Sequence, residues 1–340
     1  MQIPPARRSA ALLLGLALAS CSSHDTEFDP EKQLELYMTT ATYLYQDGSL
    51  LRAQDQAVKA LEIEPENRPM RRMIGWIRLR MGGTEDLLIA ERFFEDLAAD
   101  GDTDAPVLLG LATAEERLGT AHDEAARAIL SGERYTESPD PEKRSAELAS
   151  EAQRYFSEAH GHYEQVLSGS TQANKALNGL QRVAALQGNY EESLDWGRQL
   201  LEICKAESEG WKRALETREL SGTEEGVATE SIRTVTDLEV ETRLFSTSIL
   251  HRLGRTGEAL EHLRIAIELD PDRADLYSRR AQLQSEVGLY AEALSDLDRF
   301  LRYSTLDFEH PDVRKAYELR TFCEGRLAES ALNAEAKTGS

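Results

Sequence analysis

Two histidines and two glutamates lie close together in the segment EAHGHYE, residues 158–164. Imidazole nitrogens and carboxylate oxygens are ligands for zinc and copper, so His160, His162 and Glu164 are candidate ligands for such an ion. His160 and His162 are only two residues apart, however, and on the helix expected here they point in different directions. We therefore expect solvated helix surface at this segment, with no bound metal and no cofactor.

The sequence contains no phosphate-binding loop, no nucleophile elbow, no HExxH zinc motif and no paired CxxC. We therefore predict that the protein is not an enzyme and has no catalytic residues. A metal-binding or enzymatic periplasmic protein that uses the histidine segment is the alternative.

Cys21 follows a short apolar run, residues 9–19, which Arg7 and Arg8 precede. A membrane-spanning helix needs about 20 apolar residues, so the run is too short to span a bilayer. A basic start, an apolar stretch of about 7–15 residues and small residues at its end are typical of a secretory signal peptide. We predict that residues 1–20 are such a peptide.

The tetrapeptide Leu18-Ala19-Ser20-Cys21 resembles the lipobox of bacterial lipoproteins. The resemblance implies a diacylglycerol on the Cys21 sulfur, cleavage just before Cys21 and acylation of the new amino terminus, for example with palmitate. Several acyl chains make a stable membrane anchor, and residues 21–31 would be the lipidated tether. Ser22 stands where inner-membrane lipoproteins of enteric bacteria carry aspartate, so we expect the outer membrane, facing the periplasm. The alternatives are an ordinary signal peptide and a cytosolic protein with a misread N-terminus.

The chain is strongly acidic, with 39 basic and 61 acidic side chains. Removal of residues 1–20 takes away two arginines and leaves 37 basic against 61 acidic side chains, a formal charge of −24. Such a field repels nucleic acid and anionic lipid headgroups, so we predict no nucleic-acid partner and no membrane attachment apart from the lipid. The remaining cysteines, Cys204 and Cys323, are expected to be buried and unpaired.

Two segments near the end of the chain align without a gap. GRTGEALEHLRIAIELDP begins at Gly254 and GLYAEALSDLDRFLRYST begins at Gly288, 34 residues later, so that Ala259 matches Ala293. An earlier segment from Gly48 has Ala53 in the matching place. A ladder of glycines at similar intervals extends the pattern: Gly48, Gly82, Gly119, Gly188, Gly222, Gly254 and Gly288.

This pattern resembles the tetratricopeptide-repeat family, whose 34-residue unit is a pair of antiparallel helices. Glycine accepts the left-handed conformation at a helix end, and small alanines allow close helix contact. The resemblance implies an all-α, right-handed superhelical array of hairpins. Hairpins of this kind must stack to bury their apolar faces.

Two stretches depart from the repeat. Between Gly119 and Gly188 a turn-rich segment precedes a run, residues 142–167, that has the apolar spacing of one long helix. Either a degenerate unit or an insertion between the helices of one hairpin fills this interval; we favour the insertion. Around Gly222, β-branched residues and Gly226 predict a distorted or shortened helix.

Four residues are candidates for a partner-binding groove. In the segment RPMRRMIGWIRLR, residues 68–80, Arg72, Trp76 and Arg80 recur every four residues, and Tyr45 of the preceding unit would face the same side. Arginine and aromatic side chains dominate protein-binding hot spots. Alternatively, the arginines pair with nearby acids and Trp76 packs between helices. The lysine and asparagine set with which some family members bind a partner's terminal carboxylate is absent from the sequence.

The predicted organisation has five parts: signal peptide 1–20, tether 21–31, repeat array 32–304, capping helix 305–333 and disordered tail 334–340. The array has its clearest units at 34–67, 174–207, 240–273 and 274–304 and its irregular part at 120–168. We expect the protein to be an envelope-anchored scaffold or assembly factor that binds an envelope protein or peptide.

Overall fold

The computed structural model describes residues 29–169, 172–217 and 221–338, and these form thirteen α-helices without a strand. Residues 1–28 lie outside this part, and with them the predicted signal peptide, most of the tether and Cys21. None of the described helices is both long and apolar enough to cross a membrane. The helices are α1 (Pro30–Gln46), α2 (Leu50–Ile63), α3 (Arg68–Met81), α4 (Thr84–Ala99), α5 (Ala105–Leu130), α6 (Pro141–Gly169), α7 (Ala173–Leu186), α8 (Tyr190–Thr217), α9 (Gly222–Arg252), α10 (Thr256–Leu269), α11 (Ala274–Glu286), α12 (Tyr290–Tyr303) and α13 (Pro311–Thr338).

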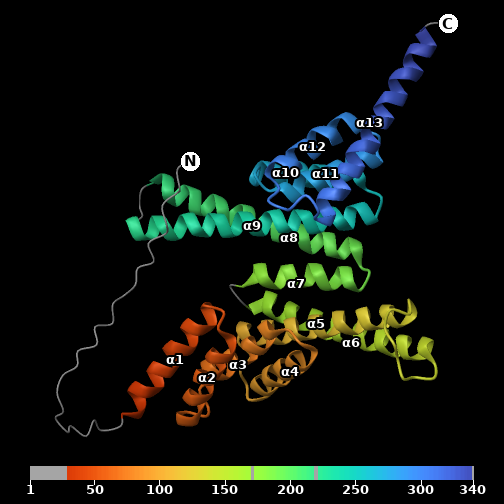
Figure 1. Cartoon of the computed structure of the whole chain (residues 1–340). Coiled ribbons are helices and arrows are strands. Elements are labelled where there is room, and N and C mark those ends of the chain that lie inside the picture. Colours follow the sequence, from red (N-terminus) through yellow and green to blue (C-terminus); the bar gives the residue numbers. More distant parts are fainter. Residues whose placement is uncertain (1–28, 170–171, 218–220, 339–340) are drawn as a thin grey trace.

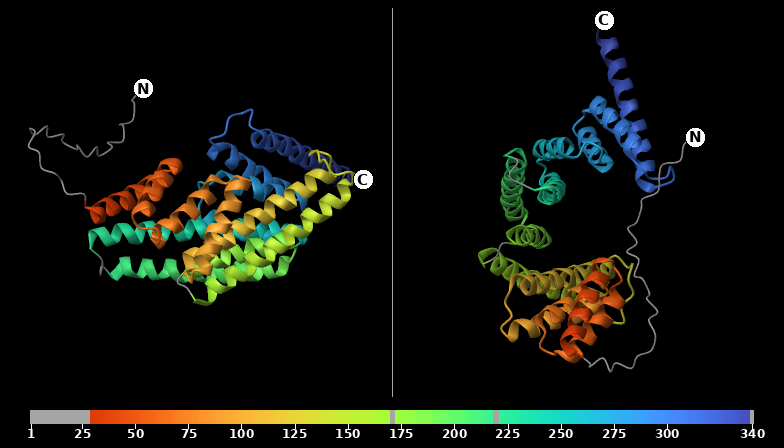
Figure 2. Two further views of the ribbon diagram at one scale, coloured as in Figure 1. Left: turned by 90° about the horizontal axis from the view of Figure 1, so that it is seen from below. Right: turned by 90° about the vertical axis from the view of Figure 1, so that its left-hand side faces the viewer.

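The first twelve helices form six successive hairpins, in which each odd-numbered helix packs against the even-numbered helix that follows it (Figure 1). Seen from the side, the hairpins follow one another around an open arc (Figure 2). The predicted all-α array of stacked hairpins is therefore confirmed.

Glycine turns and small alanines build the regular hairpins, as the repeat pattern predicts. Left-handed glycines with φ of 73–83° lie between the two helices of five hairpins, at Gly48, Gly82, Gly188, Gly254 and Gly288. Ala53, Ala259 and Ala293 are fully buried where the two helices meet. A larger side chain at these alanines would push the helices apart.

The interval between Gly119 and Gly188 contains one hairpin with unusually long helices and the beginning of the next. α5 has 26 residues and α6 has 29, and the turn-rich segment 131–140 connects them. All the apolar positions predicted for the long helix are buried in α6: Leu148, Ala152, Tyr155, Phe156, Ala159, Tyr163 and Val166. The interpretation as an insertion between the helices of one hairpin is confirmed, and the insertion itself is mostly helical.

Two predictions about glycines are wrong. Gly119 does not end a helix but lies inside α5, where it leaves room for the Phe156 ring: a Cβ there would come within 2.6 Å of that ring. The helix around Gly222 is neither distorted nor shortened: α9 runs for 31 residues from Gly222. A capping box starts α9, with the Ser221 backbone N–H donating to the Glu224 carboxylate at 2.8 Å, and α9 packs along α8.

Helix α13 covers the end of the array, as predicted for a capping helix. Val313, Ala316 and Cys323 are buried against the last hairpin. Beyond Cys323 the described side chains, residues 324–332, are exposed, and this half of the helix projects from the array (Figure 1). The helix continues to Thr338, into the segment predicted to be a disordered tail. Cys204 and Cys323 are buried and unpaired, as expected.

Candidate partner-binding site

The predicted groove residues Tyr45 and Arg80 contact each other. The Arg80 Nη1 donates to the Tyr45 carbonyl oxygen at 2.6 Å, and the guanidinium carbon lies 4.8 Å from the centroid of the Tyr45 ring. Arg80 therefore joins the second hairpin to the first.

Arg72 is held by two aspartates from the turn between α4 and α5. Its Nε donates to Asp102 Oδ2 at 2.8 Å, and its Nη2 also contacts Asp102 Oδ1 and Asp104 Oδ2. Asp102 is only 1% exposed, and its hydrogen bonds with Arg72 hold the pKa of its carboxyl below the ordinary value. The guanidinium therefore already has two intramolecular carboxylate partners.

Trp76 packs between helices, with its ring edge-on to Phe94 at a centroid distance of 5.7 Å. The contacts of Arg72 and Trp76 match the alternative in which the arginines pair with nearby acids and Trp76 packs between helices, whereas Arg80 contacts Tyr45 and not an acid. Binding of a partner at these four residues stays a prediction.

The two histidines of α6 point to different neighbours. His162 Nδ1 lies 2.8 Å from Glu115 Oε2 on α5, whereas His160 Nε2 lies 3.5 Å from Glu164 and 3.9 Å from Glu192 on α8. Across the described part of the chain, no three His, Cys, Asp or Glu side chains are placed to hold a metal ion together.

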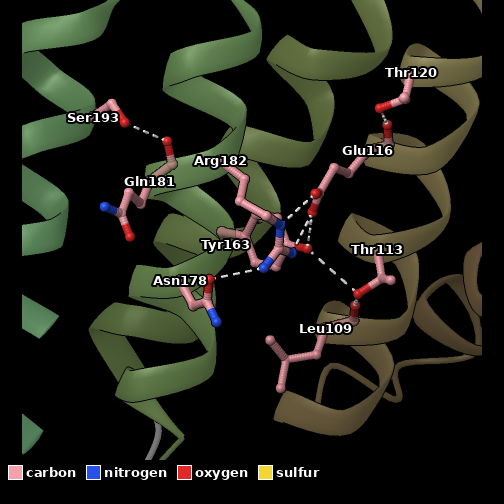
Figure 3. A network of polar contacts seen from close by, with 9 residues as sticks. All are labelled: Leu109, Thr113, Glu116, Thr120, Tyr163, Asn178, Gln181, Arg182 and Ser193. Carbon is pink, nitrogen blue, oxygen red and sulfur yellow. Dashed lines mark hydrogen bonds and ion pairs between the residues drawn. The ribbon is translucent and has the colours of Figure 1, made fainter. Parts of the chain in front are cut away.

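A buried polar network joins α5, α6 and α7 (Figure 3). Arg182 of α7 donates to both oxygens of Glu116, from Nε at 2.6 Å and from Nη2 at 2.7 Å. The Tyr163 hydroxyl donates to Glu116 Oε2 at 2.8 Å, and Arg182 Nη1 donates to Asn178 Oδ1 at 2.9 Å. One carboxylate thus connects the third hairpin to the fourth.

The electrostatics of the network keep its charges in place. Burial lowers the pKa of Arg182, but the hydrogen bonds and charge of Glu116 outweigh this effect, so the pKa lies above its ordinary value. Burial and the Glu116 charge raise the pKa of Tyr163. At neutral pH the hydroxyl is therefore a hydrogen-bond donor and the guanidinium stays positive.

Beside this network lies a pocket of about 490 Å³, between the first helices of three successive hairpins, α5, α7 and α9. Its lining combines arginines, carboxylates and apolar side chains: Glu116, Asp123, Arg127, Arg182, Ala185, Leu186, Gln187, Gly188, Tyr190, Phe245, Ser248, Ile249 and Arg252. Pockets of this size are typical of ligand sites in proteins. We take it as the candidate partner-binding site.

Sequence reasoning missed both the network and the pocket. Glu116 and Arg182 are 66 residues apart, on two hairpins whose stacking no local pattern reveals. The one available signal was Arg182 as the only charged residue of segment 176–186, because an arginine among buried neighbours favours an acidic partner.

No known family profile and no curated protein matches the sequence. Among solved structures, a thermophilic tetratricopeptide-repeat protein of Thermus thermophilus, TTC0263, is 17% identical, with 75% of this chain and 98% of that chain covered and a TM-score of 0.41. The assembly chaperone of RpL4, Acl4, is 18% identical over 90% of this chain and 99% of that one, with a TM-score of 0.39. Pseudomonas aeruginosa pilF is 12% identical over 87% and 90%, with a TM-score of 0.35.

These sequence identities and TM-scores are low, so the fold is assigned from the geometry of the chain itself. The regular hairpins repeat at 34 residues from Gly254 to Gly288, and left-handed glycines reverse the chain between their helices. Alanines are buried at matching positions, as at Ala259 and Ala293. By these features the chain has the fold of a tetratricopeptide-repeat array.

Proposed function

We propose that the protein is a scaffold that binds a partner protein in the pocket between α5, α7 and α9. The observation that carries this proposal is the pocket itself, which three successive hairpins build and which the part-buried Glu116–Arg182 pair holds in one arrangement. A site that is already formed loses little conformational entropy on binding. The proposed role of the protein is to recognise its partner, with no reaction catalysed.

The proposal places the scaffold in a bacterial cell envelope, anchored by lipid at Cys21 and facing the periplasm from the outer membrane. The lipobox-like tetrapeptide before Cys21 and the acidic mature chain support this location. A scaffold at this place would help to assemble or position an envelope protein complex.

Site-specific photocrosslinking in cells tests the scaffold. A benzophenone amino acid replaces Phe245, which lines the pocket, and in a matched strain it replaces Tyr135, which is 87% exposed in the turn between α5 and α6. We expect a discrete crosslinked protein from position 245 and none of the same mass from position 135. Equal products from both positions, or none from position 245, would contradict the proposal.

Metabolic labelling with a radioactive fatty acid tests the anchor. We expect label in the wild type and in Cys323→Ala, and none in Cys21→Ala. Label that persists in Cys21→Ala would exclude Cys21 as the anchor, and absence of label in the wild type would favour a cytosolic adaptor or an ordinary signal peptide.

A further inference from the structure

Resting on the proposed scaffold function, we infer that the pocket binds an acidic segment of the partner and that Arg252 pairs with one of its carboxylates. The pocket is locally basic although the protein is acidic: three arginines line it, against two carboxylates. Two of these arginines already have partners. Arg182 pairs with Glu116 at 2.6 Å, and Arg127 pairs with Asp123 at 2.6 Å.

Arg252 is the uncompensated charge of the pocket. Among the residues that the structure describes, no carboxylate lies within ion-pair distance of its guanidinium. The neighbouring basic side chains do have carboxylate partners: Arg255 contacts Glu191 and Glu258, and His251 contacts Glu286. An acidic protein thus leaves one pocket arginine without an ion pair.

Tyr190 positions the Arg252 guanidinium at the pocket wall. Arg252 Nη1 donates to the Tyr190 hydroxyl at 2.6 Å, and its guanidinium carbon lies 5.3 Å from the centroid of the Tyr190 ring. The remaining N–H groups of the exposed guanidinium are available to a ligand. A guanidinium held in this way can accept a carboxylate bidentately with little further loss of side-chain freedom.

A second arginine without an ion pair lies at the edge of the pocket. Arg279 of α11 donates from Nη1 to the hydroxyl of Ser248, a pocket residue, at 3.3 Å. Within the described part of the chain Arg279 has no carboxylate at ion-pair distance. Two guanidinium groups on neighbouring first helices favour a ligand that carries more than one carboxylate.

The apolar part of the lining selects a peptide over a simple anion. Phe245, Leu186 and Ala185 line the pocket together with the arginines. A peptide with acidic side chains next to an apolar one would contact both the arginines and the apolar residues of the pocket. A nucleic acid is disfavoured as the ligand, because its long negatively charged backbone would run over the acidic protein surface. A short acidic peptide segment would instead lie within about one Debye length, roughly 8 Å, of the arginines.

Fluorescence anisotropy with the purified full-length protein tests the inference. The probes are three fluorescein-labelled pools of dodecapeptides with amidated ends, in which random apolar residues alternate with Glu or Asp, with Gln or Asn, or with Lys or Arg. We expect the acidic pool to bind at least about tenfold more tightly than the neutral pool, the equivalent of one well-formed charge-assisted pair. Its affinity should fall as salt increases.

Arg252→Glu should weaken binding of the acidic pool at least about tenfold. The matched control is Arg92→Glu, which makes the same charge change at an exposed α4 residue outside the pocket and should leave binding unchanged. Arg252→Gln replaces Arg252→Glu if thermal melting shows that the glutamate variant does not fold.

Three results would overturn the inference: no binding of the acidic pool, equal binding of the neutral pool, or equal losses in Arg92→Glu and Arg252→Glu. The crosslink from position 245 would still be expected in each case if the scaffold proposal holds. Failure of the acidic-segment inference is therefore distinguishable from failure of the scaffold proposal.

Discussion

The regular hairpins at the end of the array and the long α5/α6 hairpin reach the same architecture by different packing. In the regular hairpins, the buried alanines Ala259 and Ala293 allow two helices to meet closely. In and around the long hairpin, large rings lie against glycines instead: a Cβ on Gly110 would lie 2.3 Å from the Phe94 ring, and one on Gly179 would lie 2.3 Å from the Tyr163 ring. The regular hairpins thus place alanines at their helix contacts, whereas the long hairpin and its neighbours place glycines against rings, both within a hairpin, as at Gly119, and between hairpins, as at Gly110 and Gly179.

Ion pairs of the two regions differ in the helices that they join. In the regular region, Arg280 Nε lies 2.6 Å from Oδ2 of Asp296, and this pair joins the two helices of one hairpin, α11 and α12. Glu116 and Arg182 instead join α5 to α7, across two hairpins. The Glu116–Arg182 pair therefore fixes how the fourth hairpin stacks on the third, and the pocket forms at that junction.

Removal of the Glu116 carboxylate should have the largest effect on stability. Glu116→Ala leaves the partly exposed Arg182 guanidinium and the buried Tyr163 hydroxyl without their acceptor, and we expect a loss of about 2–3 kcal/mol. Asp296→Ala should lose stability in a similar way, but only Glu116→Ala should change the stacking of hairpins. Urea unfolding gives the loss, and small-angle scattering gives the radius of gyration. An unchanged radius of gyration in Glu116→Ala together with a changed radius in Asp296→Ala would contradict the role of Glu116 in hairpin stacking.

Gly110→Ala tests the ring-against-glycine packing. The Phe94 ring has little room to move, because its Cζ atom also lies only 2.6 Å from a would-be Cβ on Gly75. We expect a loss of about 1–3 kcal/mol from overpacking. Gly210→Ala is the matched control within α8, where a Cβ would meet nothing within 4 Å, and it should gain up to about 1 kcal/mol. Thermal melting compares the two, and equal melting temperatures would contradict the packing account.

The third and smallest expected effect concerns how stability depends on pH, with opposite signs around the long α5/α6 hairpin and in the regular hairpins. Burial and the charges of Glu95 and Glu115 raise the pKa of Glu91 from 4.5 to about 7 in the folded protein. The folded state therefore binds the proton more tightly, and this group's contribution to stability falls as pH rises from about 4.5 to 7. The hydrogen bond with Glu115 raises the pKa of His162, so stability from that pair is also lost as pH rises through the folded pKa.

In the regular region the sign is reversed at His262 of α10. Burial, together with the charge of Arg243, lowers the pKa of His262, so its contribution to stability is lost as pH falls. We expect Glu91→Gln to be more stable than the wild type at pH 8 by about 1–2 kcal/mol, after a discount for solvent screening, and equal to it at pH 4.5. Urea unfolding across this pH range gives both values. A Glu91→Gln curve parallel to the wild-type curve would exclude Glu91 as the titrating group.

The helices and the regular hairpins can be predicted from the sequence alone. Residues 142–167 show their apolar face at helical spacing, and the 34-residue offset places Gly254 and Gly288 in turns because glycine alone enters the left-handed region at little cost. These features depend on residues close together in the chain. Local periodicity and backbone chemistry therefore suffice to predict them.

Which distant side chains meet follows only from the three-dimensional packing of the helices. In the sequence Gly119 resembles a turn glycine, but in the structure it makes room for the Phe156 ring. Arg72 resembles a groove residue, but its guanidinium binds Asp102, which lies 30 residues further along the chain in the turn before α5. The Glu116 network and the pocket beside it likewise depend on the angle at which one hairpin stacks on the next. That angle results from packing many side chains together at once, so no short stretch of sequence contains it.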